Sequence, residues 1–411
     1  MGPHPRLCVE AVVDANIPVH ELIKLCAADS DFFAHTFFPK AMRAVSPPFS
    51  KQIWSALENP KHRLLNIEVF RGGAKTTRLR IFTAKRIAYG ISRTILYVGA
   101  SESHAVRSVQ WLRSQIEPLV GADGQSRPSP FASTFSLRPG RKWQEHEIEI
   151  FHGIDAHPIW ILGVGITGNI RGINFDDYRP DLIIVDDALT DENAQTQEQC
   201  NKVADLIMGA LANSLSQEEP NSKLAMLNTP LNPFDVCSKA KESTEWHTET
   251  FGCWSEETQD RPVDEQISAW PEMFPTDVLR KRKLDAIADN RYSIFAREME
   301  CKLVAAESLS FRPNWLRFYE PDDLPKGMQC VLAIDPVPPP SDAAVQKGLA
   351  RHDYEAISVV GRLKGEYYLI DYAISKGHNP NWTVAKMFEF GLRYRIMRVV
   401  VETVAYQRVL K

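Results

Sequence analysis

The chain has 411 residues, of which 44% are hydrophobic and 24% are charged, and its formal net charge is -4. This charge excludes a uniformly basic nucleic-acid binder, although it leaves room for local basic surfaces. The seven cysteines are scattered and form no Cys-x-x-Cys pair, which argues against a disulfide framework or a zinc site and favours a reducing cytosol. No run of about 18 apolar residues predicts a membrane span, so we expect a cytoplasmic protein without a membrane partner.

Short helices are predicted over residues 1–60, where apolar residues recur at three- and four-residue spacing. From "RLLNIEVF" onward, apolar strands alternate with polar or helical segments, as in "RTILYVGA", "PIWILGVGI", "DLIIVDD" and "KLAMLNTP". This alternation is typical of an α/β sheet, so residues 61–305 are predicted to form an α/β domain. A linker is expected over residues 306–327, and a second strand series occupies residues 328–411.

The segment "VFRGGAKTTRL" has the composition of a phosphate-binding loop. The nucleotide-binding residues predicted in it are Gly72, Gly73, Ala74, Lys75, Thr76 and Thr77. The glycines let backbone N–H groups face phosphates, the lysine can reach them, and the first threonine can hold Mg²⁺ at a helix start. Because Ala74 and Val69 stand where the usual pattern has glycines, a plain strand–turn–helix corner explains the segment equally well on its own.

A second nucleotide motif is predicted further along, where "RPDLIIVDDALTDE" carries an apolar strand into two carboxylates. Asp186 can hold Mg²⁺ through water, and Asp187 can polarise the attacking water. Taken alone, the segment is more simply a core strand with an acidic edge. Together with the lysine loop it predicts an ATPase site.

Two weaker segments add to this predicted site. "AMLNTPLNP" ends a strand in Asn228 and Thr229, a polar tip that can sense the γ-phosphate and couple its loss to a neighbouring domain. The glycine-rich loop "GVGITGNIRGINFDDYRPD" carries Arg171, which can stabilise phosphoryl transfer in cis or across a subunit boundary. A solvated loop arginine is an equally good interpretation of Arg171 alone.

In their order, "RGGAKTT", "GNIRG", "LIIVDD", "LNTP", "FAREME", "AIDP" and "VVVETVAYQ" resemble the motifs of large terminase subunits, which package DNA into tailed-phage and herpesvirus-type capsids. The resemblance implies a P-loop ATPase domain with a helical N-terminal segment, followed by a partial RNase H-like α/β nuclease domain. It also implies that Arg71 belongs to the nucleotide loop and that Arg171 is a finger acting in trans. Gln52 would contact adenine, although an exposed helix glutamine is the simpler interpretation.

Two positions depart from the family pattern. Asp187 stands where many members have the catalytic glutamate, and Asn228 stands where glycine or a small hydroxyl residue is common. The shorter acid at position 187 is expected to make hydrolysis slower or to change its geometry.

The C-terminal strand series carries acids expected for a nuclease. "VLAIDP" ends in Asp335 and "RVVVETVAYQ" contains Glu402, and nucleases of the RNase H kind present such acids to two Mg²⁺ or Mn²⁺ ions. Asp353 ranks below them, since a turn aspartate facing solvent is the simpler interpretation. The family's third metal-binding aspartate normally lies several elements beyond the second acid, whereas this sequence ends at Lys411. We therefore expect a truncated chain in which ATPase chemistry survives and DNA cleavage does not.

Basic segments offer contacts for DNA phosphates. "RKRK" at 280–283, with Arg291 and Arg297, and "RPGRKW" at 138–143 could follow a DNA backbone, although a solvated surface is the simpler interpretation of each. No base-reading motif appears, which suits a translocase that ignores sequence.

The preferred function is therefore an ATP-driven motor that moves double-stranded viral DNA into a procapsid, with an incomplete metal nuclease. The resemblance implies ATP and Mg²⁺ as cofactors. It implies as partners a portal protein, a small terminase subunit and further copies in a ring on the portal, within the bacterial host cytoplasm. The alternatives are another nucleic-acid-stimulated P-loop ATPase of the helicase-like kind, and an inactive prophage remnant that only binds partners.

Overall fold

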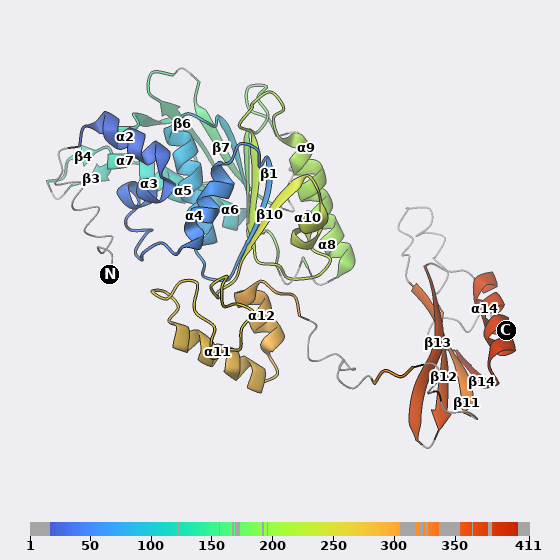
Figure 1. Cartoon of the computed structure of the whole chain (residues 1–411). Coiled ribbons are helices and arrows are strands. Elements are labelled where there is room, and N and C mark those ends of the chain that lie inside the picture. Colours follow the sequence, from blue (N-terminus) through green and yellow to red (C-terminus); the bar gives the residue numbers. More distant parts are fainter. Residues whose placement is uncertain are drawn as a thin grey trace. The chain divides into compact units, whose positions relative to one another are not determined.

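The structure is a computed structural model in which two compact units, Met1–Ser310 and Phe311–Lys411, are distinguished (Figure 1). The described residues are 17–121, 123–155, 157–166, 168, 173–190, 193–194, 196–304, 317–320, 324, 328–336, 354–363, 365–376 and 380–401. Within these ranges, no helix is long and apolar enough to cross a membrane.

Three helices precede the first strand: α2 (Val19–Ala28), α3 (Ser30–Phe37) and α4 (Phe49–Glu58). Asp29 caps α3, because its carboxylate accepts hydrogen bonds from the N–H groups of Asp31 and Phe32. Phe33 and Ile53 are fully buried in the same core cluster as the sheet residue Leu65. The N-terminal helices are therefore part of the packing of the first unit.

The first unit is built on an eight-stranded sheet with the order β10-β1-β9-β8-β2-β7-β6-β5. The strands from β10 to β7 run parallel to their neighbours, whereas β6 and β5 are antiparallel. The predicted α/β class is confirmed. The strand bounds are β1 (Leu64–Val69), β2 (Thr94–Gly99), β5 (Leu137–Trp143), β6 (Glu147–His152), β7 (Ile159–Gly165), β8 (Leu182–Asp186), β9 (Lys223–Asn228) and β10 (Trp246–Phe251).

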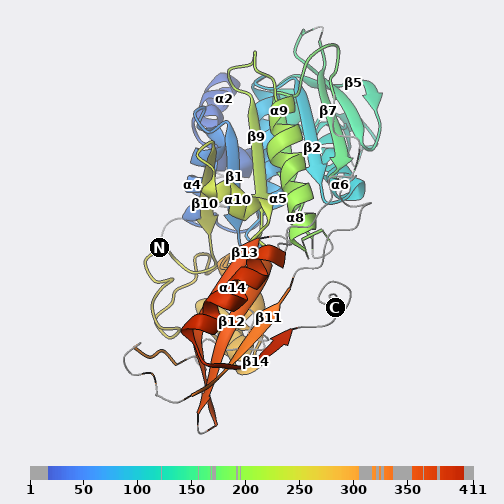
Figure 2. The same cartoon turned by 90° about the vertical axis from the view of Figure 1, so that its right-hand side faces the viewer.

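Helices cover both faces of this sheet (Figures 1 and 2). One face carries α5 (Lys75–Ala88) and α6 (Glu102–Ile116) beside the N-terminal helices. The other carries α8 (Gln197–Ala204), the π-helix η1 (Asp205–Leu211), α9 (Ala212–Ser214) and α10 (Val236–Glu242). Successive strand residues divide between the two cores, as when Tyr97 faces the first and Val98 the second. Such burial on both sides explains why the strands read as continuous apolar runs.

Smaller elements complete the first unit. A short helix, α7 (Pro130–Thr134), and a two-stranded ribbon of β3 (Leu119–Val120) and β4 (Ser126–Arg127) follow α6. After β10 come two helices, α11 (Thr276–Ala288) and α12 (Tyr292–Glu300). Their packing is centred on a buried ion pair, since Lys283 Nζ lies 2.6 Å from Glu300 Oε1.

The second unit has a four-stranded sheet with the order β13-β12-β11-β14. β11 (Gln329–Asp335), β12 (Tyr354–Leu363) and β13 (Glu366–Lys376) are antiparallel neighbours, and β14 (Ile396–Val401) runs parallel to β11. Helix α14 (Pro380–Arg393) connects β13 to β14 and contributes Phe390 to a core with Leu332 and Ile357.

Candidate functional site

Three parallel strands bring the predicted nucleotide motifs together at one edge of the main sheet. β9 lies between β1 and β8. Asn228 of β9 pairs with Glu68 of β1. On its other side, Leu227 of β9 pairs with Asp186 of β8. Because the strands run in the same direction, the loop after β1, the acids ending β8 and the polar tip of β9 are neighbours at their carboxyl ends.

The loop between β1 and α5 has a backbone shape that requires small residues. Gly72 has φ +84°, and a Cβ there would lie 2.8 Å from the Phe274 ring. A Cβ on Gly73 would lie 2.5 Å from a side-chain carbon of Val69. Ala74, which replaces the usual glycine, is left-handed with φ 61°, a conformation that costs an L-residue about 1 to 2 kcal/mol. The loop leads into the N-terminus of α5, where free N–H groups and the helix dipole favour an anion.

Lys75 is the first residue of α5, and its ammonium group is buried between the strand ends. Nζ donates hydrogen bonds to the Val69 carbonyl oxygen at 3.1 Å and to Thr229 Oγ1 at 2.9 Å. The Asp187 carboxylate is 3.8 Å from the same nitrogen. Thr229 Oγ1 also donates to the Val69 carbonyl at 3.2 Å. The end of β1 and the tip of β9 together fix the position of the lysine side chain.

Thr76 and Asp186 form an oxygen-rich pair that suits Mg²⁺. Thr76 Oγ1 donates to Asp186 Oδ1 at 3.1 Å. Burial raises the pKa of Asp186 to about 7, and the neighbouring Asp187 carboxylate adds to the effect. In the described part of the chain, no group of three or more His, Cys, Asp or Glu side chains could hold a metal ion. A Mg²⁺ ion does not require one, because it binds through one or two carboxylates together with phosphate oxygens and waters.

Asp187 follows the last residue of β8 with a left-handed φ of 44°, a strained conformation of the kind found at functional sites. Its N–H donates to the Leu227 carbonyl at 3.2 Å. Its side chain is 47% exposed, so water can reach the carboxylate. Asn228 Oδ1 accepts from the N–H of Ala188 at 2.9 Å and thereby holds the segment after the acid. At the tip of β9, Thr229 therefore contacts the lysine and Asn228 contacts the acid-bearing strand end.

Three other residues that were predicted to bind the nucleotide lie near the loop, outside the group formed by Lys75, Thr76 and the two aspartates. Arg71 is 78% exposed, and its Nη1 lies 3.4 Å from Glu298 Oε2 of α12. Gln52 is exposed on α4 and lines a groove of about 950 Å³ with residues of β10 such as Phe251. Thr77 is half-buried in the first turn of α5.

Sequence reasoning missed Arg78, which is buried directly behind the loop. Its Nη1 donates to the Gly73 carbonyl, and its Nη2 donates to Ser50 Oγ at 2.5 Å. The guanidinium lies over the rings of Phe49 and Trp270, 5.3 and 5.8 Å from their centroids. Burial lowers its pKa to about 10, so it remains charged at neutral pH. Its sequence context, a threonine pair followed by arginine, gave no signal for this supporting position.

Two further arginines were also missed. A cavity of about 110 Å³ adjoins the acids and is lined by both aspartates, Thr76, Arg80, His104 and Arg107. Arg80 Nε donates to Ser108 Oγ at 3.1 Å, which holds its side chain between α5 and α6. Positive charge is therefore present beside the acid pair. The helical periodicity of α5 and α6 did not distinguish these residues from ordinary surface cations.

Arg171, Asp353 and Glu402 lie outside the described residues. Asp335 is the exposed last residue of β11. Its neighbour Ile334 pairs in parallel with Val401, the last residue of β14.

The basic segment 280–283 is only partly available to a ligand. Lys283 is buried and donates to Glu300, and it lies over the rings of Trp254 and Tyr292. Arg280 Nε donates to the Gln266 carbonyl at 2.8 Å. Lys283 is therefore not available to a DNA phosphate and stabilises the α11–α12 packing instead.

No protein-family model and no curated protein matches the chain. Solved structures are similar to it at low identity. The large terminase of a thermophilic bacteriophage is 10% identical with a TM-score of 0.37, covering 87% of this chain and 78% of that chain. The ATPase domain of the Thermus phage P74-26 large terminase is 10% identical with a TM-score of 0.38, covering 59% of this chain and 89% of that chain. The Phi-28 gp11 DNA packaging motor is 12% identical with a TM-score of 0.31, covering 83% and 91%.

Proposed function

We propose that this chain is the ATP-hydrolysing subunit of a motor that translocates double-stranded DNA, of the large terminase kind. The observation that carries the ATPase part is the convergence of Lys75, Thr76 and Asp186 at the carboxyl ends of parallel strands, beside a loop shaped for small residues. A lysine, a hydroxyl and a carboxylate in this arrangement are the parts with which P-loop ATPases bind a nucleotide and its metal ion.

In the proposed mechanism, the loop N–H groups and Lys75 bind the β- and γ-phosphates. Lys75 would exchange its hydrogen bond to Thr229 for a phosphate oxygen, because Thr229 Oγ1 can still donate to the Val69 carbonyl. Thr76 and Asp186 would hold Mg²⁺, which supplies positive charge to the phosphate oxygens.

Asp187 is proposed to orient the attacking water and accept its proton. Its exposed carboxylate is aimed by a backbone that is held on either side, because the Leu227 carbonyl accepts from the N–H of Asp187 and Asn228 Oδ1 accepts from the N–H of Ala188. The water oxygen would form a bond to the γ-phosphorus while the bond to the bridging oxygen breaks, leaving ADP and phosphate. Arg171 is proposed to reach the γ-phosphate of a neighbouring subunit, which requires a homo-oligomeric ring.

Loss of the γ-phosphate is proposed to be sensed by Thr229 and Asn228. Thr229 contacts Lys75, and Asn228 contacts the strand end after Asp187. A shift of either partner would reach β9 directly, which supports a coupling role for its tip.

The second unit is proposed to be an RNase H-like nuclease domain, in which Asp335 and Glu402 bind Mg²⁺ or Mn²⁺. The parallel pairing of β11 and β14 supports this, because Asp335 ends one strand and Glu402 directly follows the other. Viral double-stranded DNA, a portal protein and a small terminase subunit are the proposed partners.

A triplex-displacement assay tests this function against a helicase-like alternative. A double-strand translocase should remove a third strand from a DNA triplex in an ATP-dependent way, without separating the two strands of the duplex. Lys75→Ala should abolish both ATP turnover and displacement, whereas Lys202→Ala, at an exposed lysine on α8, should leave both unchanged. Strand separation would favour the helicase-like ATPase, and a folded wild type without turnover would favour the inactive remnant.

A further inference from the structure

A second cavity lies at the opposite end of α5 from the phosphate loop. Its volume is about 350 Å³, and it is lined by the last turns of α5, by Glu58 at the end of α4 and by Lys223 at the start of β9. None of the residues of the proposed ATPase site lines it. Because Lys223 begins its strand, this cavity lies at the amino edge of the sheet.

Three cations of this cavity are buried, and only one has a carboxylate in contact. Lys85 Nζ lies 2.6 Å from Glu58 Oε1. Arg86 donates only to neutral oxygens, from Nε to Ser92 Oγ and from Nη2 to the Asn221 carbonyl, both at 2.7 Å. Lys223 is 3% exposed, and its Nζ donates to the Asn59 carbonyl at 2.8 Å. Among the described residues, no carboxylate lies within 4 Å of the charged nitrogens of Arg86 or Lys223. The cavity therefore carries two positive charges without an ion-pair partner.

Longer-range charges and the helix dipole compensate these cations only in part. Asp181 attracts Arg86, and Glu58 attracts Lys223, but burial has the larger effect on the pKa of each cation. Lys85 and Arg86 lie in the last turn of α5, where cations are favoured. Lys223 begins a strand, and its Nζ donates to the carbonyl of Asn59, the C-cap of α4, where a helix dipole also favours a cation. Burial, with Arg86 nearby, lowers its pKa to about 8, so it is still largely charged at pH 7. A buried ammonium without an anion destabilises a fold, and a bound anion would remove this effect.

The rest of the wall is apolar. Phe82, Tyr89 and Ile91 line the cavity beside the cations. Tyr89 is held in place because its hydroxyl donates to the Ile23 carbonyl at 2.7 Å. The volume falls in the lower part of the range of small-molecule sites, which combine apolar walls with a few fixed polar groups.

We propose that this cavity binds a phosphomonoester whose phosphate is carried by a flat, apolar ring system. The two unpaired charges match a phosphate dianion, which carries about -1.5 to -2 at pH 7. Lys223 and Arg86 would bind the phosphate oxygens, and the ring would pack against Phe82 and Tyr89. This site is separate from the proposed ATPase site and does not depend on that function.

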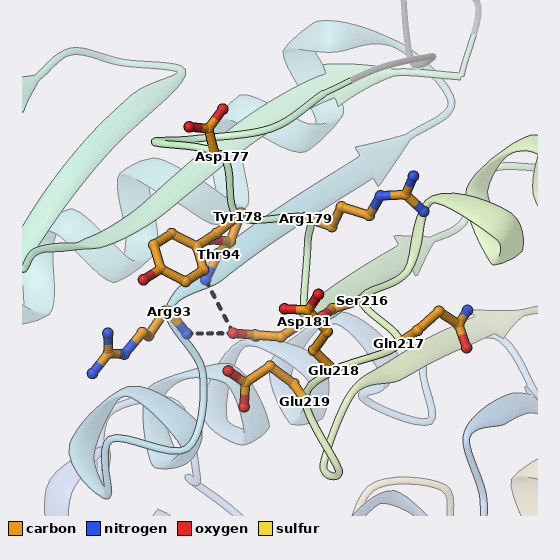
Figure 3. A pocket seen from close by; sticks show the side chains of 10 residues that line it. All are labelled: Arg93, Thr94, Asp177, Tyr178, Arg179, Asp181, Ser216, Gln217, Glu218 and Glu219. Atoms are coloured by element: carbon orange, nitrogen blue, oxygen red, sulfur yellow. Dashed lines mark hydrogen bonds between the residues drawn. The ribbon is translucent and has the colours of Figure 1, made fainter.

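A neighbouring pocket at the same sheet edge is more acidic (Figure 3). Its volume is about 260 Å³, and its charged lining residues are the acids Asp177, Asp181, Glu218 and Glu219 and the arginines Arg93 and Arg179. Asp181 is buried, and one of its oxygens accepts from the N–H groups of Arg93 and Thr94 at 2.6 and 3.2 Å. Because acids outnumber arginines in this lining, a phosphate should bind less well here than in the basic cavity.

Binding of phenyl phosphate, measured by calorimetry, tests the proposal. The full chain carries Lys75→Ala, so that the phosphate loop does not contribute. Phenyl phosphate should bind at least about 10-fold more tightly than inorganic phosphate, and phenol should not bind measurably. Lys223→Met should weaken phenyl phosphate at least about 10-fold, whereas the exposed Lys281→Met should not change it. Equal affinities of the Lys223→Met and control proteins for phenyl phosphate would overturn the proposal. Equal affinities for phenyl phosphate and inorganic phosphate would refute the proposal that the ligand carries an apolar ring.

A labelling experiment on the unsubstituted lysines avoids any effect of Lys223→Met on folding. Acetic anhydride modification is followed by mass spectrometry with and without phenyl phosphate. The compound should slow acetylation of Lys223 and leave that of Lys281 unchanged. Equal modification of Lys223 in both samples would contradict binding at this cavity.

Discussion

The two ends of α5 hold buried cations in contrasting surroundings. At the first, Lys75 lies beside a threonine hydroxyl and 3.8 Å from a carboxylate, directly after the glycine loop that leads into the helix. At the other, Arg86 and Lys223 have only neutral oxygens as hydrogen-bond partners. The first end can be identified from one short segment, because loop and lysine are contiguous. The second is assembled from residues as far apart in the sequence as Glu58 and Lys223, and only the fold brings them together.

The largest effect is expected in a test of whether a neighbouring subunit completes the nucleotide site around Lys75, at the first end of α5. Arg171→Ala and Lys75→Ala proteins should each be inactive alone, since an arginine finger contributes about 10³ to 10⁵ in rate. Mixed rings should regain turnover, because an intact arginine can then face an intact loop. Steady-state ATP hydrolysis of mixtures, with mixing verified by native mass spectrometry, is the measurement. Absence of recovery in mixed rings would remove the trans role of Arg171.

A smaller effect on the rate of ATP hydrolysis is expected from substitution of Asp187, the acid beside Lys75. Asp187→Asn should lower kcat for ATP about 10² to 10⁴-fold, because an amide cannot accept the proton of the attacking water. Asp187→Glu should keep part of the activity, since it restores a base of greater reach. Nucleotide affinity, measured by calorimetry, should change little in either variant. Wild-type turnover by Asp187→Asn would return the acid pair to a structural role.

Much of the candidate site at the first end of α5 was predictable from the sequence. The fold class followed from apolar strands alternating with helices, and Lys75, Thr76 and Asp186 followed from two local motifs. Arg78 and Arg80 could not be found in this way, because helical spacing does not say which arginine faces a loop or a cavity. Lys223 looked like an ordinary strand start, and its burial depends on packing against the end of α4. Contacts between segments distant in sequence decide such cases.

Stability and catalysis should respond in opposite directions at Asp186. Because its pKa is raised from 3.8 to about 7 in the folded protein, the unfolded chain binds fewer protons between these values. The stability of the nucleotide-free protein should therefore fall as the pH rises from about 4 to about 7. Asp186→Asn should stabilise it by about 1 to 3 kcal/mol at pH 8 while suppressing turnover. Urea unfolding at several pH values measures this, and an unchanged pH slope would contradict it.

The smallest effect concerns the second end of α5. The pKa of Lys223 is lowered from 10.5 to about 8, so the unfolded chain binds more protons between these values and stability should rise with pH across them. Lys223→Met should stabilise the ligand-free protein by about 1 to 2 kcal/mol at pH 7, and this gain should disappear above about pH 10.5. Thermal unfolding of wild type and variant at both pH values provides the comparison. A destabilised variant at pH 7 would mean that the Lys223 ammonium group stabilises the folded protein overall.

The backbone contacts between the phosphate loop and the region of α12 give the first unit a mechanical connection. Phe70 donates to the Phe251 carbonyl, Arg71 to that of Glu298, and Cys253 to that of Met299. The first two bonds attach β10 and α12 to the two residues preceding the loop glycines, and the third attaches the segment after β10 to α12. Under the proposed function, a loop that moves when phosphate leaves would therefore move α12 with it.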